Sequence, residues 1–214
     1  MFRTWVICIV GILCFGQPVY GADASAEESE KPDTVQSDAA LRDALLTFNI
    51  QRRKDQITGM SVLLGWSVAN MGVGAVGWSQ ADSPEWVAFH QGNIGWNAVN
   101  MALAVPGLLS GINDDPRKHS LGDGLQKSHA SQIAFGFNTG LDVGWAMMGL
   151  WVLERGMHRD DPRLLGLGRS MILQGGALFL FDLVMWMKVA SRHRRFIATP
   201  VVGERLGVQV STTF

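Results

Sequence analysis

Two aspartates in apolar surroundings are the residues of this sequence best suited to chemistry. Asp142 is the only charged residue from 132 to 153, and Asp182 is the only one from 170 to 187. An ionised carboxylate in the middle of a membrane helix costs at least about 2.5 kcal/mol, so such groups usually face a bundle interior. Because asparagine would fix helix register without that cost, we interpret the carboxyls as a site that binds a cation, shares a proton or faces an aqueous path.

Uncharged polar residues recur beside the two aspartates at helical spacing. His90, Asn93, Asn97 and Asn100 follow one another at intervals of three or four residues, which stacks them along one helix face. Asn138 lies four residues before the first aspartate and therefore shares its face. The candidate ligand or ion-binding set is Asp142, Asp182, Asn97, Asn100, Asn70, Asn138, His90, Asn93 and Gln174.

The amides of this set have a second interpretation. Intramembrane amide side chains commonly hydrogen-bond across helices and fix their register, and each such bond contributes roughly 0.6 to 2 kcal/mol. We favour this structural role for the asparagines. For Asp142 and Asp182 we favour a functional role, because an ionised carboxyl group is costly inside a membrane and an uncharged side chain would fix helix register equally well.

Four long apolar segments must position these residues. Segments 56–81 and 86–113 contain no charged residue, and segments 132–153 and 170–187 contain one aspartate each. A helix needs about 20 apolar residues to cross a bilayer. The expected fold class is therefore all-α, a polytopic membrane protein with a four-transmembrane-helix bundle.

Composition agrees with this class and excludes others. The 214 residues suggest one domain, and only 17% of them are charged, against a usual figure of about 25%. A net charge of -1 gives no basic excess for gripping a phosphate backbone, so we expect no nucleic acid as partner. The expected partner is the lipid bilayer, and the sequence identifies no cofactor or metal.

The N-terminal segment reads as a secretory signal peptide. Arg3 precedes an apolar run over 5–15, which is short for a bilayer span, although an uncleaved anchor remains the alternative. Cys8 and Cys14 lie in this run, so the mature chain would contain no cysteine. The expected organisation is a signal peptide over 1–21, a disordered acidic leader over 22–38, an amphipathic interfacial helix over 39–57, the four-helix transmembrane domain over 58–192 and a C-terminal tail over 193–214.

The amphipathic helix is predicted from apolar residues at helical spacing. Leu41, Leu45 and Phe48 lie beside the basic residues Arg52 and Arg53, which is typical of a helix at a membrane surface. A solvent-exposed helical stalk is the alternative.

Glycines predict close packing of the third apolar segment. Gly136, Gly140 and Gly144 recur every four residues, nearly opposite the face of Asp142, so another backbone can approach there. The same stripe could instead form a homo-oligomer.

The loops repeat the string Asp-Asp-Pro-Arg, at 114–117 and at 160–163. Aspartate before proline commonly caps and starts a helix. We therefore interpret both copies as helix caps.

Three strings combine glycine, tryptophan and polar residues: FHQGNIGWNAVNMALA (Phe89–Ala104), FNTGLDVGWAMMGLWVLERG (Phe137–Gly156) and LQGGALFLFD (Leu173–Asp182). Together they resemble the hallmark segments of a family of uncharacterised bacterial membrane proteins, a domain of unknown function. The resemblance spans about residues 40–192 and implies a signal peptide, a basic helix and four membrane helices, without an activity. The positions that resemble the family's marked polar residues are His90, Asn93, Trp96, Asn97, Asn100, Asn138, Asp142, Glu154, Arg155, Gln174 and Asp182.

Two rules disagree on orientation in the bacterial inner membrane. A cleaved signal peptide places the mature N-terminus outside the cytoplasm, whereas the positive-inside count favours the reverse. We follow the signal peptide and expect a multi-pass protein with an extracytoplasmic mature N-terminus.

These features predict a protein that binds or conducts an ion, a proton or a small solute. The runner-up is a structural or assembly subunit of a membrane complex, in which the polar residues only fix helix packing. An intramembrane enzyme ranks third, because the sequence has no Ser/His, H-E-x-x-H or paired-Asp motif of known catalytic type.

Overall fold

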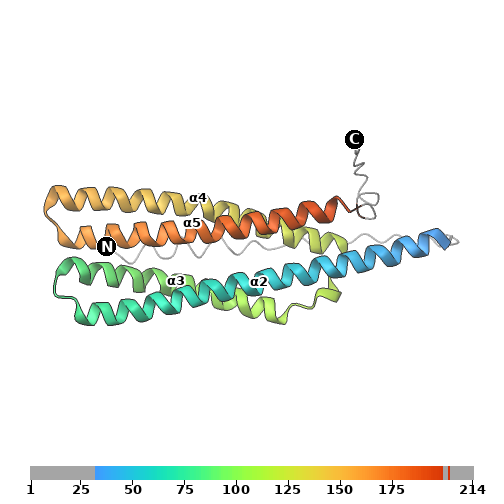
Figure 1. Cartoon of the computed structure of the whole chain (residues 1–214), viewed down its shortest axis with the longest axis horizontal. Coiled ribbons are helices and arrows are strands. Elements are labelled where there is room, and N and C mark those ends of the chain that lie inside the picture. The colour runs from blue at the N-terminus through green and yellow to red at the C-terminus, as the bar shows by residue number, and fades with distance from the viewer. Residues whose placement is uncertain (1–31, 200–201, 203–214) are drawn as a thin grey trace. The chain divides into compact units, whose positions relative to one another are not determined.

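The computed structural model describes residues 32–199 and 202, with side chains from residue 37 onward. This part of the chain is helical and contains no strand. Its elements are α2 (Pro32–Gln80), α3 (Pro84–Asn113), the short 3-10 helix η1 (Pro116–Lys118), α4 (Leu121–Arg159) and α5 (Pro162–Ile197) (Figure 1). The predicted signal peptide, the leader up to residue 31 and most of the predicted tail lie outside the described residues.

Helix α2 joins segments that the sequence divides. Residues 39–57 and the apolar segment 56–81 form one helix without a break, and residues 32–38, which we predict as disordered leader, form its first turns. Residues 193–197 of the predicted tail are the last turn of α5. The apolar segments 132–153 and 170–187 are inner parts of the longer helices α4 and α5, and segment 56–81 covers the C-terminal part of α2, because polar residues beyond an apolar stretch still extend the same hydrogen-bonded backbone.

The two Asp-Pro repeats begin helices, as predicted. The Asp115 carboxylate accepts a hydrogen bond from the Arg117 backbone N–H at 3.1 Å, at the start of η1. The Asp161 carboxylate accepts one from the Arg163 N–H at 2.9 Å, at the start of α5. Each proline occupies a first-turn position, where a helix has no use for an N–H.

The described helices are apolar on the outside and polar on the inside. Val73, Met147 and Leu180 are 60 to 69% exposed, whereas Asn97 and Gln174 are fully buried. A soluble monomer rarely exposes extended apolar patches, because water disfavours them. Two helices, α2 over Ser37–Gln80 and α5 over Pro162–Ile197, are long and apolar enough to cross a membrane.

Helices α4 and α5 lie alongside each other, and at several glycines their backbones come into direct contact (Figure 1). A Cβ added at Gly168 would lie 2.6 Å from the Leu153 backbone nitrogen, and one at Gly175 would lie 2.8 Å from that of Ala146. Only glycine permits this approach. Asp160, which joins the two helices, adopts a left-handed conformation with φ 49°, which aspartate tolerates better than most residues.

The glycines of the predicted stripe do not lie at these close backbone contacts. Gly140 and Gly144 have nothing within 4 Å of an added Cβ, and Gly136 meets only the Trp186 side chain, at 3.1 Å. Within this chain, close backbone approach occurs at other glycines. The expectation that the stripe brings helices together within the bundle is wrong, because four-residue spacing defines a face but not the neighbour that it meets.

Two apolar clusters stabilise the bundle at different levels. Leu63, Ala104 and Leu178 form one between α2, α3 and α5. Phe48 and Phe196 stack with ring centroids 4.1 Å apart in the other, between α2 and the end of α5. Leu41, Leu45, Leu121 and Leu125 also pack against this second cluster. The apolar residues Leu41, Leu45 and Phe48 of the predicted interfacial helix therefore contact other helices of the chain.

Candidate functional site

A network of amide side chains centres on Gln174, which is fully buried in α5. Its Nε2 donates to Asn93 Oδ1 of α3 at 2.9 Å and to Asn70 Oδ1 of α2 at 3.4 Å. Its Oε1 accepts from Trp66 Nε1 at 3.2 Å. One side chain thus joins three helices, and its carbonyl and amino groups both have partners.

The network continues along α3. Ser170, one turn before Gln174, donates its hydroxyl to Asn93 Oδ1 at 3.1 Å. Asn97 donates to the Asn93 backbone carbonyl at 2.8 Å, and Asn100 donates to Asn97 Oδ1 at 3.4 Å. All three asparagines are at most 5% exposed. The predicted polar face of α3 therefore lies inside the bundle, with its amides paired.

Asp142 and Asp182 form a separate pair between α4 and α5. They are 5% and 6% exposed, and their carboxyl groups lie within hydrogen-bonding contact of each other. Among the described residues, neither forms an ion pair with a basic side chain. Asp142 Oδ2 is buried and has no hydrogen-bond partner in the described part of the chain. Two acids from different helices thus face each other without a counter-charge.

An apolar level separates the amide network from the carboxyl pair. Leu178 lies one helical turn from Gln174 and one turn from Asp182, and it is buried against Leu63 and Ala104. The step from Gln174 to Asp182 corresponds to about 12 Å along the axis of α5. The sequence predicts one polar cluster at this depth, and the structure divides it into two.

His90 and Asn138 stand apart from both groups. The His90 ring fills the space that a side chain at Gly77 would need, since an added Cβ would lie 2.2 Å from it. Its Nδ1 is buried without a hydrogen-bond partner among the described residues. Asn138 lies half-buried one turn before Asp142 on α4. Neither residue is bonded to the amide network.

Sequence reasoning missed Trp66 and Ser170 as members of the amide network. The Trp66 indole N–H donates to the Gln174 side chain in the interior. Ser170 precedes Gln174 by four residues, and this helical spacing was the available signal.

Charged side chains are buried where α2 meets the ends of the other helices, and no local sequence pattern predicts this burial. Arg52 is 6% exposed and pairs with Asp114 at 2.5 Å, and Asp55 is 7% exposed. Arg53 donates to the backbone carbonyl of Gly111 at 3.0 Å and to that of Ile112 at 2.8 Å, which caps α3. We predicted these arginines at a membrane surface, but their partners are more than 50 residues away in sequence.

Asp114 collects several donors just beyond the end of α3. Besides Arg52, its carboxylate contacts His119 Nε2 at 2.7 Å and Lys127 Nζ at 3.3 Å. Partial burial raises the pKa of Asp114, but the bonds from His119 and Arg52 outweigh it and lower the pKa to about 2. This aspartate therefore stays ionised and ties η1 and the start of α4 to α2.

Comparison with known proteins gives a family. A family model matches residues 62–183, which is more than half of the chain. The chain belongs to DUF6992, a family of unknown function. The DUF6992 match includes both the amide network and the carboxyl pair, and it ends before Arg192. No curated protein and no solved structure matches the chain significantly.

Proposed function

We propose that this DUF6992 protein is a four-span protein of the bacterial inner membrane. The support is the apolar exterior of all four long helices, together with the length and hydropathy of α2 and α5. Charged side chains concentrate beyond the apolar stretches, as the bilayer requires. The signal peptide places the mature N-terminus outside the cytoplasm in this proposal.

Reporter fusions test the span count and the orientation together. A fusion after Ser37 and one between residues 156 and 169 are separated by three spans in this proposal, so they should lie on opposite sides. The first should be active in the periplasm and the second in the cytoplasm. Equal activity of the two fusions would contradict the four-span arrangement, and the reverse pattern would contradict the orientation.

We infer that the carboxyl pair is a binding site for a proton or a small cation. One observation carries this inference: Asp142 and Asp182 contact each other inside the bundle with no basic partner among the described residues. Two carboxylates in contact repel each other strongly when both are ionised. A shared proton removes this repulsion, and so does a bound cation. In this proposal the carboxyl pair takes up and releases one proton or one small cation.

Polar residues of α4 and α5 also occur between the pair and one end of the bundle. Asn138 is one turn from Asp142, and Gln132 lies further along α4. Beyond them, Ser128 Oγ and His193 Nδ1 lie 3.1 Å apart across the two helices. In this proposal a proton reaches the carboxyls along this line, and the protein is a proton- or cation-binding module that can conduct its ion.

The amide network has a positioning role in this proposal. Gln174 holds α2, α3 and α5 in one register, and its own hydrogen-bonding groups are used in doing so. A fully used amide has little capacity left for a ligand. This observation also supports the second candidate function, a structural subunit of a membrane complex, in which the carboxyl pair would be one more interhelical contact.

Infrared spectroscopy on the purified protein in lipid separates the two candidates. The C=O stretch of a protonated carboxyl group should be present in the wild type near neutral pH, because the pair keeps a proton. Asp142→Asn and Asp182→Asn should remain folded, since the amide is nearly isosteric, and should lose this band. Asp82→Asn, which changes an exposed loop residue, is the matched control and should keep it.

Ion exchange by the same variants completes the test. In proteoliposomes that contain a pH-sensitive dye, the wild type and Asp82→Asn should dissipate a pH gradient, and both intramembrane variants should not. If both variants dissipate the pH gradient as fast as the wild type does, and the unfolding midpoint of the wild type does not change with pH or added cations, the carboxyl pair has the structural role instead.

A further inference from the structure

A buried layer of positive charge lies between α2 and α5, away from the carboxyl pair. Arg192 of α5 pairs with Asp55 of α2, and Lys188 pairs with the same carboxylate at 2.8 Å. Arg52 of α2 pairs with Asp114 at 2.5 Å. The side chains of Arg52 and Arg192 are only 7% and 14% exposed. Such groups are rarely buried unless partners compensate for their lost hydration.

The compensation in this layer is incomplete. Arg52 Nε and Arg192 Nη1 are buried and have no hydrogen-bond partner among the described residues. The Asn49 side chain, which is fully buried one turn before Arg52 on α2, also has no hydrogen-bond partner among the described residues. An unpaired buried donor costs about 1 to 3 kcal/mol, and a charged donor costs more. Asn49, Arg52 and Arg192 therefore each carry a buried donor without a partner among the described residues.

The charge of the layer is also unbalanced. The buried Arg52 and Arg192 pair with the carboxylates of Asp114 and Asp55, and the two half-exposed lysines Lys127 and Lys188 pair with the same two carboxylates, so four cations share two anions. The guanidinium groups of Arg52 and Arg192 repel each other. An anion at this position would relieve both the repulsion and the unpaired donors.

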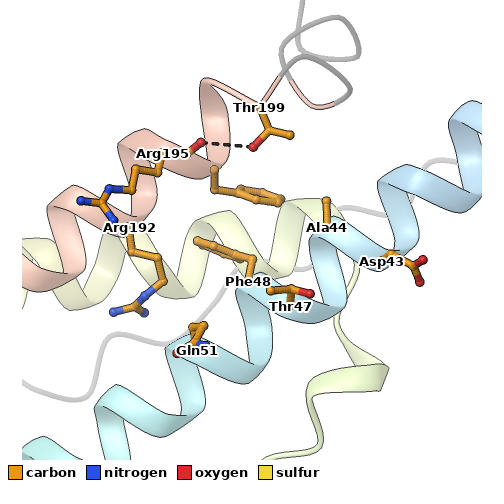
Figure 2. A pocket seen from close by; sticks show the side chains of 9 residues that line it. Asp43, Ala44, Thr47, Phe48, Gln51, Arg192, Arg195 and Thr199 are labelled. Carbon is orange, nitrogen blue, oxygen red and sulfur yellow. Dashed lines mark hydrogen bonds between the residues drawn. The ribbon is translucent and has the colours of Figure 1, made fainter.

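An open groove gives access to Arg192 from outside. It encloses about 380 Å³ and its lining includes Thr47 and Gln51 of α2 with Arg192 and Arg195 of α5. Figure 2 shows Arg192 extending from α5 toward α2 near Gln51, while Asp43 stands at the far end of the groove. The groove is thus positive where it meets the buried layer.

We propose that this layer is a binding site for a phosphate group, held by the guanidinium groups of Arg52 and Arg192 and by the Asn49 amide. The planar guanidinium presents N–H donors in a fork that matches phosphate oxygens, and each bond is assisted by charge. The inference is independent of the carboxyl pair, which lies on other residues. The phosphate arrives either free in solution or on a lipid head group.

Thermal unfolding in detergent tests the site with defined probes. Inorganic phosphate should raise the unfolding midpoint of the full chain, and sodium chloride at equal ionic strength should not, because a ligand that binds only the folded state stabilises it. Adding phosphatidylglycerol, compared with phosphatidylcholine, distinguishes the two sources. A response to phosphatidylglycerol alone assigns the site to a lipid head group, and a response to phosphate assigns it to the free ion.

Two variants and a control locate the effect. Arg192→Gln should weaken phosphate binding about tenfold or more, because it removes charged donors. Arg194→Gln removes the same charge from an exposed position two residues away and should bind as the wild type does. Asn49→Asp should abolish binding and still fold with wild-type stability or more, since its carboxylate would occupy the place of the anion.

The outcomes separate this site from general surface charge. Stabilisation by phosphate or phosphatidylglycerol that is lost in Arg192→Gln and Asn49→Asp but kept in Arg194→Gln supports the proposal. Equal loss in the 192 and 194 variants overturns it, because the anion then follows net charge. No stabilisation of the wild type by either probe also overturns it. A drop in the stability of Asn49→Asp contradicts the assigned role of the amide.

Discussion

Adding one methyl group between α4 and α5 should disturb the chain far more than adding it one residue later. Gly175 and Gly176 are consecutive in α5 and lie on different sides of it. A Cβ at Gly175 would lie 2.8 Å from the Ala146 backbone nitrogen and 2.9 Å from the Asp142 carbonyl oxygen. At Gly176 an added Cβ meets nothing within 4 Å. The two alanine substitutions are therefore chemically identical and differ only in what the methyl group meets.

The geometry gives the size of the effect. Ordinary contact begins at 3.4 Å, so Gly175→Ala requires α4 to move away from α5 by about 0.6 Å. Backbone cannot swing aside as a side chain can, and overpacking of this kind costs about 1 to 3 kcal/mol. Gly176→Ala should be neutral or gain up to about 1 kcal/mol from helix propensity. A difference of about 2.5 kcal/mol corresponds to about 5 to 10 °C in the unfolding midpoint.

Thermal unfolding of both variants in the same detergent measures this difference directly. Gly175→Ala should also weaken the infrared band of the protonated carboxyl pair, because the displaced backbone carries Asp142. If Gly175→Ala unfolds at or above the temperature of Gly176→Ala, the close approach of the two helices is not a feature of the folded protein, and the reasoning fails.

Two further predictions concern the polar groups. Gln174→Leu should destabilise the protein by about 1 to 3 kcal/mol by leaving Trp66 Nε1 without an acceptor, whereas the exposed neighbour change Leu173→Ala should cost less; denaturant titration compares them. The folded-state pKa of Asp114, about 2, lies below its ordinary value of 3.8, so its contribution to stability is complete above about pH 4 and is lost as pH falls toward 2. Unfolding midpoints across this range should therefore converge for the wild type and Asp114→Asn at low pH; a constant gap would contradict the assignment.

Much of the helical architecture was predictable, because four long apolar segments with almost no charged residues indicate four long helices. The interval of three and four residues also predicted that Asn93, Asn97 and Asn100 share one buried face, and all three are buried. Aspartate before proline predicted two helix starts. These features are local, and each can be read within one helix.

What the sequence could not supply is which faces meet. Gln174 pairs with Asn93 and Asn70 across 81 and 104 residues, while Asp182, on the same helix, faces α4. The rotation of α5 about its own axis decides which of its residues face α2 and α3 and which face α4. Sequence periodicity shows which residues share a face, but not which neighbouring helix that face meets. Arg52 was misplaced for the same reason, because a charged residue reads as exposed until its partner is known.

The sidedness of α5 reverses along its length. Over residues 170–187 its exposed residues are apolar, as at Leu180, while Gln174 and Asp182 are buried; beyond Lys188, Arg194 and Arg195 are exposed and Phe196 is buried. For a bundle seated in a bilayer, this reversal marks the level at which hydrocarbon gives way to water. One continuous helix would therefore face hydrocarbon along one part of its length and water along the other. In the proposed membrane arrangement, the part of α5 that faces lipid is stabilised by close packing and amide bonds, and the part that faces water is stabilised by the hydrophobic effect, which weakens on cooling.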